Sequence, residues 1–243
     1  MVVRIVRFRL DGLVRGGSLS LEDNRIVSGG EVLAIEDVEL LAPCCPSKIV
    51  CVGLNYVEHA KELKMKLPEE PILFLKPPSA VIGPGAEIVM PKSSERVDYE
   101  GELGVVIGKR CKAMAADEAK KYVLGYTCFN DVTARDLQQK DGQWTRAKSF
   151  DTFAPFGPWI ASIDPSNADI KTRVNGEVKQ SSNTADLIFG VPKLIEFISH
   201  VMTLEPGDVI ATGTPSGVGR LEKGDVVEVE IEGIGVLKNR VAL

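Results

Sequence analysis

The stretch Asp98–Gly108, DYEGELGVVIG, decides how this sequence folds. Its second half is apolar and β-branched, which is typical of a strand that enters a protein core. Its first half carries a carboxylate at every second position, at Asp98, Glu100 and Glu102. Residues two apart in a strand face the same side, which places Glu100 and Glu102 roughly 7 Å apart. The pattern predicts one strand that enters the core with negative charge along one face.

That row of charge has two interpretations. In the first, the carboxylates lie at an exposed strand end or pair with Lys92 or Arg96. In the second, they bind a hard cation, because sites made of carboxylate oxygens suit Mg²⁺, Mn²⁺ or Ca²⁺. The third ligand would then be Asp131, where an apolar strand ends in CFNDVTARD. Asp136 is the next choice, although Arg135 beside it suggests a loop ion pair. Spacing alone leaves both interpretations open.

The rest of the chain reads mostly as short strands. From residue 71 onward, β-branched segments alternate with glycine-containing turns. Helical spacing appears at 57–64, 115–123 and 192–204. The face predicted for the last of these helices contains Leu194, Ile198, Val201 and Met202.

The order of these segments predicts the fold class. Strands do not alternate regularly with helices, which argues against a doubly wound parallel sheet. We expect an α+β, mostly β architecture of mixed sheets with a few peripheral helices. Residues 1–46 contain short strands separated by turns and end at a proline-flanked stretch, APCCPSK. We therefore predict a small β-rich N-terminal extension at 1–46 and a main domain at 47–243.

Composition argues against several classes of protein. The 243 residues are 44% hydrophobic and 26% charged, as in ordinary soluble proteins. A net charge of −5 argues against nucleic acid as a partner. No apolar run approaches the roughly 20 residues of a membrane helix, and MVVRIVRFRLDGL lacks the features of a secretory signal. We expect a cytoplasmic protein without a membrane partner. The five cysteines lack framework spacing and a CxxC pair, which predicts reduced thiols.

Two histidines are present, and they receive different interpretations. His59 and Glu62 are three residues apart on a predicted helix, so their side chains can meet. Such a pair is either a surface ion pair or a general base whose basicity is set by the carboxylate. His200 lies beside Glu196 on the polar side of its helix, and we interpret it as a solvated residue.

Two further segments are candidates for substrate contact. Lys148 lies between a polar loop and an apolar strand in TRAKSFDTFAPFGPW. In ATGTPSGVG, residues 211–219, backbone N–H groups and the hydroxyls of Thr212, Thr214 and Ser216 are available to hold an anion. A tight turn between two strands explains the same segment equally well.

Taken in order, the segments from about residue 48 to the C-terminus resemble the fumarylacetoacetate hydrolase family. The resemblance rests on CVGLNYVEHAKEL, FLKP, DYEGELGVVIGK, GYTCFNDVTARDLQ, AKSFDTFAPFGPW, NG, LEPGDVIATGTPSGVG and GDVVEVEIEGIG. The N-terminal stretch resembles the small, variable extension of the shorter family members. The resemblance implies a β-rich roll with mixed sheets, usually assembled as a homodimer.

The resemblance also implies a metal site. Glu100, Glu102 and Asp131 would bind a divalent cation, usually Mg²⁺ or Mn²⁺, with Asp98 as a neighbour rather than a ligand. Three carboxylates and one such cation leave a charge of −1, which Lys148 would neutralise. Glycines at 101 and 104 are smaller than the family pattern leads us to expect, a difference that should affect packing more than chemistry.

For catalysis, the resemblance implies that His59 and Glu62 form a water-activating dyad on a segment that closes over substrate. Lys148, Gln138 and Thr214 would contact the 2-oxo-acid end of a small-molecule substrate. The expected chemistry uses a metal-stabilised enolate. The dyad favours hydrolysis of a C–C bond in an acylpyruvate-like substrate, or isomerisation of a 2-hydroxy-dienedioate.

Other outcomes of the same chemistry remain open. Decarboxylation of an oxaloacetate-like acid and dehydration of a 2-oxo-3-deoxy sugar acid use the same electron sink. A non-catalytic metal- or ligand-binding protein on this scaffold is an alternative of another class. The presence of all three metal carboxylates together with the dyad and Lys148 argues against it.

Overall fold

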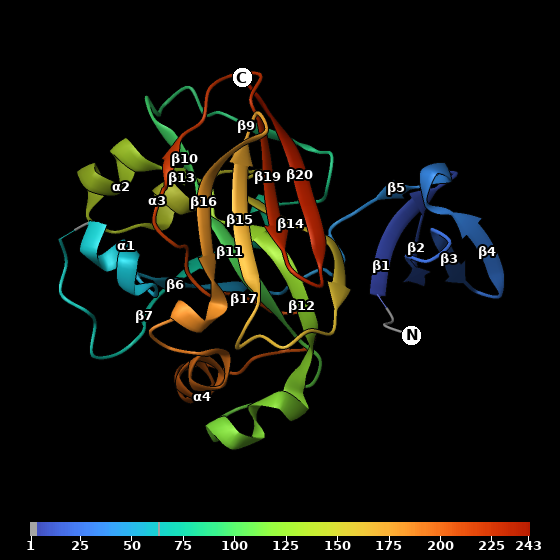
Figure 1. Cartoon of the computed structure of the whole chain (residues 1–243), viewed down its shortest axis with the longest axis horizontal. Coiled ribbons are helices and arrows are strands. Elements are labelled where there is room, and N and C mark those ends of the chain that lie inside the picture. Colours follow the sequence, from blue (N-terminus) through green and yellow to red (C-terminus); the bar gives the residue numbers. More distant parts are fainter. Residues whose placement is uncertain (1–3, 63) are drawn as a thin grey trace.

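The computed structural model describes residues 4–62 and 64–243, and Figure 1 shows β-sheets with a few helices around them. The α+β, mostly β class and the absence of a doubly wound sheet in this part of the chain are as predicted. The predicted N-terminal extension at 1–46 and the predicted helix at 57–64 include residues 1–3 and 63, respectively, which lie outside the described residues.

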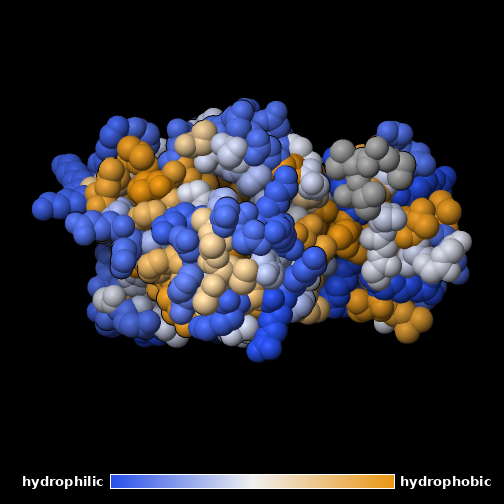
Figure 2. Space-filling view, turned by 90° about the horizontal axis from the view of Figure 1, so that it is seen from below, coloured by the Kyte–Doolittle hydropathy of each residue, from blue (hydrophilic) through white to orange (hydrophobic). Residues whose placement is uncertain are grey.

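Residues 4–40 form a lobe beside the main body in Figures 1 and 2. Its strands are β1 (Arg4–Leu10), β2 (Leu13–Ser20), β3 (Arg25–Ser28), β4 (Glu31–Ala34) and β5 (Glu39–Leu40). Its own small core contains Val6, Phe8, Leu19 and Ile26. Strand β1 also pairs with the main sheet, where Ile5 lies opposite Ile160. The lobe is therefore joined to the main body through a shared sheet, and hydrophobic side chains gather where the two meet (Figure 2).

The main sheet continues from β1 in the order β14-β12-β11-β17-β6-β7. These strands are β14 (Ala154–Ala161), β12 (Val123–Asn130), β11 (Gly101–Ile107), β17 (Val209–Ala211), β6 (Ile49–Gly53) and β7 (Ile72–Lys76). Most neighbours are antiparallel, whereas β17 and β6 are parallel. Strand β11 is buried along its whole length, as its apolar sequence predicts.

Two further sheets complete the main body. One has the order β16 (Glu177–Asn183), β15 (Asp169–Val174), β19 (Val226–Ile231), β20 (Gly235–Ala242) and β9 (Glu87–Val89). The other is small and contains β13 (Thr133–Ala134), β10 (Val97–Tyr99) and β18 (Gly219–Arg220). The largest hydrophobic cluster lies between the main and the five-stranded sheet, and it includes side chains of β11, β12 and β19.

The α-helices are short and peripheral: α1 (Val57–Glu62), α2 (Arg135–Asp141), α3 (Thr145–Lys148) and α4 (Val191–Val201). The segment predicted as a helix at 115–123 is a 3₁₀ helix, η3 (Ala116–Tyr122). Helix α4 buries Leu194 and Ile198 as predicted, but Val201 is 56% exposed. Val201 is the last helical residue, and the chain becomes extended at Met202, so the predicted apolar face ends one turn early.

Within the described part of the chain, no helix is both long and apolar enough to span a membrane. All five cysteines are free thiols, as predicted, and Cys51, Cys111 and Cys128 are buried.

Candidate metal centre and active-site cavity

Asp98 and Glu102 lie on different strands, so the prediction of one continuous strand is wrong. Asp98 belongs to β10 in the small sheet, Glu102 belongs to β11 in the main sheet, and Glu100 lies between the two strands. Strand β15 approaches this point so closely that a Cβ atom on Gly101 would lie 2.0 Å from the Thr172 hydroxyl. The unexpected glycine is therefore required by packing where the chain passes from one sheet to the other.

The three predicted metal ligands nevertheless meet. Carboxylate oxygens of Glu100, Glu102 and Asp131 all lie within 4.8 Å of one another, and all three residues are buried. Asp131 directly follows β12, the antiparallel neighbour of β11, and its N–H donates to the Glu100 carbonyl at 2.8 Å. Three converging carboxylates are a donor set that suits a hard divalent cation such as Mg²⁺ or Mn²⁺.

Glu102 is the carboxylate with the least compensation. Burial, together with the nearby charges of Asp131 and Glu100, raises the pKa of Glu102 well above its ordinary value. Its Oε2 accepts a hydrogen bond from the Gly213 N–H at 2.8 Å, which offsets only part of this effect. A divalent cation would supply the missing positive charge, so the residues present fit such an ion.

Lysines from two elements contact the other two carboxylates. Lys148 of α3 donates to Asp131 Oδ2 at 2.5 Å and to Glu100 Oε2 at 3.0 Å. Burial disfavours the charged form of Glu100, but Lys148 and then Arg135 lower its pKa to about 2. Lys76, the last residue of β7, donates to Asp131 Oδ1 and to a backbone carbonyl. Burial lowers the pKa of Lys76, although Asp131 partly offsets this effect.

The predicted dyad forms on α1. His59 Nδ1 lies 3.0 Å from Glu62 Oε2, and the Gly217 N–H donates to Glu62 Oε1 at 3.3 Å. The side chain of His59 is only 11% exposed, whereas that of Glu62 is 42% exposed. The pair is therefore attached to the loop at 211–219 and is more than an isolated surface contact.

A single cavity of about 540 Å³ is lined by the His59–Glu62 dyad, the three clustered carboxylates and Lys148. This volume is in the range of small-molecule sites in proteins. Apolar and aromatic side chains complete its wall, among them Leu54, Met65, Ile72, Phe74, Trp144 and Val218. The ammonium group of Lys148 lies 4.9 Å from the centre of the Phe74 ring. The cavity thus combines a cation-binding carboxylate cluster, a candidate base and an apolar wall.

Comparison with known proteins agrees with this arrangement. Residues 48–242 match the family described as fumarylacetoacetate (FAA) hydrolase C-terminal. The chain belongs to the fumarylacetoacetate hydrolase family. A family relative, the human mitochondrial oxaloacetate tautomerase FAHD2B, is 46% identical over 92% of this chain and 76% of its own length. An uncharacterized protein of Archaeoglobus fulgidus is 60% identical over 96% and 94%.

Solved structures show the same fold. The 5-carboxymethyl-2-hydroxymuconate delta-isomerase of Mycobacterium smegmatis has a TM-score of 0.93 at 47% identity, covering 98% of both chains. The 2-hydroxyhepta-2,4-diene-1,7-dioate isomerase of Mycobacterium marinum has a TM-score of 0.91 at 44% identity, covering 99% of this chain and 98% of its own. The FAH-like fold expected from the resemblance is confirmed.

Of the substrate contacts implied by the family resemblance, Gln138 lines the cavity from α2. Its Oε1 accepts a hydrogen bond from Arg135 at 2.6 Å. Arg135 also donates to Asp98 and Glu100, so it belongs to the carboxylate cluster and not to the predicted loop pair with Asp136. A role for Gln138 in binding substrate stays a prediction.

Thr214 also lines the cavity, but its hydroxyl already has partners. It donates to the Gly101 carbonyl at 2.9 Å and accepts from Gln180 at 2.8 Å. Two N–H groups of the same loop, those of Gly213 and Gly217, donate to Glu102 and Glu62. The prediction that these particular groups are free to hold an anion is therefore wrong, because they fix the carboxylates of the site instead.

The remaining candidates lie outside the metal cluster. Asp136 accepts hydrogen bonds from Ser94 and from the Glu95 N–H, so it caps a loop. His200 is exposed, as predicted, and its Nδ1 lies 2.8 Å from the Glu196 carbonyl.

Sequence reasoning missed three groups of this site. Lys76 was noted only as part of FLKP. Its position at the end of an apolar strand could have indicated a buried lysine, and a buried ammonium group needs a carboxylate close to it. Arg135 was assigned to the wrong carboxylate, and Gln180 gave no signal in the sequence. Arg96 does pair with Asp98, as the first interpretation expected, without displacing the other carboxylates from their cluster.

Proposed function

We propose that this chain is a divalent-metal-dependent enzyme that moves a proton on a 2-oxo dicarboxylate, interconverting its keto and enol or dienol forms. The observation that carries the proposal is that the carboxylate cluster, Lys148 and the His59–Glu62 pair line one cavity. The names of its relatives support it, since one is an oxaloacetate tautomerase and others are isomerases of dienedioate-type acids.

Glu100, Glu102 and Asp131 would hold the cation, with Mg²⁺ or Mn²⁺ as the expected ion. When bound, it would supply Lewis acidity toward the carboxylate and keto oxygens of a 2-oxo acid. Lys76 and Arg135 keep the ligand carboxylates oriented through their hydrogen bonds to Asp131 and Glu100. Lys148, between Glu100 and Asp131, adds positive charge next to the position of the substrate carboxylate.

The proton transfer is assigned to His59. With Glu62 accepting a hydrogen bond from Nδ1, the neutral imidazole carries its lone pair on Nε2. Nε2 removes a proton from the carbon next to the keto group and returns it to oxygen or to a more distant carbon. Glu62 stabilises the imidazolium formed in between.

Charge balance favours a dicarboxylate as substrate. The cluster contains four carboxylates, those of Asp98, Glu100, Glu102 and Asp131. Four cationic side chains each contact at least one of these carboxylates, namely Lys76, Arg96, Arg135 and Lys148. The negative and positive charges are therefore equal in number. A bound divalent cation would therefore leave two positive charges on this cluster, and the carboxylate of Glu62, which lines the same cavity, is 42% exposed, so solvent screens much of its charge. A substrate with two carboxylates neutralises them.

Arg96 is the group that would read the second carboxylate. Its Nε donates to Asp98 at 2.9 Å, and its side chain is half exposed and lines the cavity. Among the described residues, its two terminal nitrogens have no hydrogen-bond partner. Asp98 thus holds the guanidinium while leaving its outer face free for a carboxylate.

Hydrolysis of an acylpyruvate-like C–C bond is the second candidate. The partial exposure of the dyad favours it, because Glu62 is accessible to solvent and water can reach His59 from that side. Decarboxylation does not require such a base. An expected homodimer is compatible with either reaction.

The test offers oxaloacetate, a 2-hydroxy-dienedioate and the monocarboxylate acetylpyruvate to the enzyme with Mg²⁺, with Mn²⁺ and with EDTA. Absorbance would follow the enol forms, and NMR in D₂O would follow exchange at the carbon next to the keto group. We expect metal-dependent tautomerisation of at least one dicarboxylate. Metal-dependent cleavage of acetylpyruvate without tautomerisation would establish the second candidate, and inactivity toward both dicarboxylates would overturn the proposal.

A further inference from the structure

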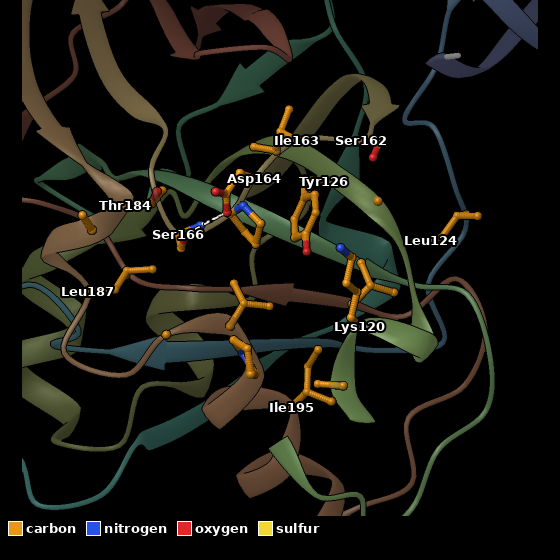
Figure 3. A pocket seen from close by; sticks show the side chains of 18 residues that line it. Lys120, Leu124, Tyr126, Ser162, Ile163, Asp164, Ser166, Thr184, Leu187 and Ile195 are labelled. Atoms are coloured by element: carbon orange, nitrogen blue, oxygen red, sulfur yellow. Dashed lines mark hydrogen bonds between the residues drawn. The ribbon is translucent and has the colours of Figure 1, made fainter. Parts of the chain in front are cut away.

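A second cavity lies apart from the carboxylate cluster and is larger, with a volume of about 760 Å³ (Figure 3). Its wall is formed by η3, β12, the loop at 162–166, residues 184–187 and the start of α4. None of the described residues that line it also lines the first cavity. It is called the lower cavity below, because α4 and η3 lie at the bottom of Figure 1.

Most of the lower cavity is apolar. Its wall includes Ile163, Leu187, Val191 and Ile195, and Figure 3 shows Ile163, Leu187 and Ile195 around it. Val191 and Ile195 belong to the buried face of α4, and Ile163 packs against the largest hydrophobic cluster. Side chains from separate elements therefore offer an apolar surface of the kind that binds hydrocarbon groups.

Tyr126 is the polar group that this apolar wall does not explain. It is only 7% exposed, and Figure 3 shows its hydroxyl directed into the lower cavity. Within the described part of the chain, this hydroxyl has no protein hydrogen-bond partner, and it borders the open cavity instead of being sealed among the fully buried polar atoms. Burial, with a smaller contribution from Asp164, raises the pKa of Tyr126 to about 12, so the group is a neutral donor. The hydroxyl is therefore available to donate a hydrogen bond to a ligand acceptor in the cavity.

Two further features favour a negative charge beside this hydroxyl. Lys120 of η3 directs its amino group into the lower cavity, and it has no ion-pair partner among residues 4–62 and 64–243. The N-terminus of α4, at Gly190 and Val191, also lines the cavity, and no side chain in the described ranges caps it. Helix N-termini carry partial positive charge and unpaired N–H groups.

One carboxylate limits what can bind. Asp164 lines the lower cavity, and its Oδ1 accepts hydrogen bonds from the Ser166 N–H at 3.0 Å and the Ser166 hydroxyl at 2.7 Å. These hydrogen bonds lower the pKa of Asp164, so its charge is permanent near neutral pH. Asp164 also acts electrostatically on Tyr126 and Lys120, so the single positive charge of Lys120 leaves room for one negative charge on the ligand, and a second would be repelled by Asp164.

We propose that the lower cavity is a second binding site, for a small amphipathic monocarboxylate. Its carboxylate accepts hydrogen bonds from Tyr126 and Lys120 near the N-terminus of α4. Its hydrocarbon part packs against Ile163, Leu187 and Ile195. This site has a different ligand chemistry from the metal centre, and it requires neither a metal nor the proposed reaction.

The test is isothermal titration calorimetry of octanoate into the full chain in EDTA, with 1-octanol as the uncharged probe of equal length. We expect saturable binding of one octanoate, and binding of 1-octanol at least about tenfold weaker because it lacks the charge that pairs with Lys120. Tyr126→Phe and Lys120→Met should each weaken octanoate by about five- to tenfold. Arg96→Gln, at the half-exposed side of the other cavity, should leave octanoate affinity unchanged.

These variants should fold, because one removes a single oxygen and the other changes an exposed side chain, and thermal unfolding would verify this. Equal affinity for octanoate and 1-octanol would show non-specific hydrophobic binding and overturn the proposal. Octanoate binding that is absent in the wild type, or insensitive to both substitutions in the lower cavity, would overturn it as well. Loss of octanoate binding in Arg96→Gln would move the ligand to the metal centre and overturn the proposal.

Discussion

The two cavities of this molecule treat buried polar groups in opposite ways. In the metal centre, Lys76, Lys148 and Arg135 are all bound to carboxylates, and the imbalance is concentrated on Glu102. In the lower cavity the walls are mostly apolar, and the Tyr126 hydroxyl faces the cavity without a partner among the described residues. The difference arises because the two cavities contain different kinds of polar group. A buried ion needs a compensating charge from the protein, whereas a neutral hydroxyl that faces a cavity can be left without a protein partner at lower cost.

One short segment links the lining of the lower cavity to the dyad helix and the loop at 211–219. Leu187 lines the lower cavity and its backbone bridges to Tyr56, the residue before α1. Asn55 holds this segment, since its side chain accepts from the Phe189 N–H at 2.8 Å and donates to the carbonyls of Phe189 at 3.0 Å and Thr212 at 2.8 Å. The segment is thus connected on one side to the apolar site and on the other to the dyad helix and the loop that holds Glu102.

The largest effect is expected from Glu102→Gln, which removes the uncompensated charge from the metal centre. Metal-dependent turnover should fall by about 10³-fold or more, and affinity for Mn²⁺ should fall with it. Octanoate binding in the lower cavity should not change. Calorimetry with Mn²⁺ and the oxaloacetate assay check this, with exposed Glu177→Gln as the matched control. Full metal affinity in Glu102→Gln would contradict the assignment of the ligands.

His59→Ala separates the base from the metal. Turnover should fall by about 10²-fold because the positioned base is lost, while metal affinity stays as in the wild type. Proton exchange into the 2-oxo acid, followed by NMR in D₂O, is the measurement. His200→Ala provides the control, since this exposed histidine is far from the cavity lining. Unchanged exchange in His59→Ala would make the dyad structural.

Asn55→Ala removes the side chain that holds this linking segment in place. The loss of three hydrogen bonds from a fully buried side chain should lower the free energy of unfolding by about 2–3 kcal/mol. Thermal unfolding should then occur roughly 4–10 °C lower. Exposed Asn167→Ala should change stability by less than about 0.5 kcal/mol. A similarly small effect of Asn55→Ala would show that the segment does not depend on this residue.

Arg96→Gln tests the charge count at the mouth of the metal centre. The ratio kcat/KM for oxaloacetate should fall by about tenfold, which corresponds to about 1.4 kcal/mol for one partly exposed ion pair. Acetylpyruvate, which has one carboxylate, serves as the internal control and should be affected much less. An equal loss for both substrates would remove Arg96 from the recognition of the second carboxylate.

The smallest effect is expected from Tyr126→Phe in the absence of ligand. Because this hydroxyl borders the open cavity and has no protein partner, its removal should leave turnover unchanged and change the free energy of unfolding by less than about 0.5 kcal/mol. Chemical denaturation is the measurement, with Tyr122→Phe as the matched control because Tyr122 is less buried. Destabilisation by Tyr126→Phe would indicate that the hydroxyl already has a partner inside the protein.

Much of this architecture was determined locally. The apolar run of β11, the glycine-containing turns between strands and the spacing of His59 and Glu62 depend on neighbours in the chain, so their sequence pattern is informative. The position of Asp131 directly after β12 was also predictable, because a strand that stops at a polar loop presents its next side chain at the sheet edge. These features, with the order of the segments, were enough to identify the family and to predict the three carboxylates that meet in one cluster able to bind a metal.

The charge compensation was decided only in the tertiary structure. Lys76, Arg135 and Gly101 take their roles from elements remote in sequence, namely Asp131, Asp98 with Glu100, and β15. The same is true of the Thr214 hydroxyl and the Gly213 N–H. The sequence suggested that they could bind an anion, but they donate hydrogen bonds to the Gly101 carbonyl and to Glu102. The lower cavity had no sequence signal at all, because it exists only where the ends of five separate elements meet and leave Tyr126 unpaired.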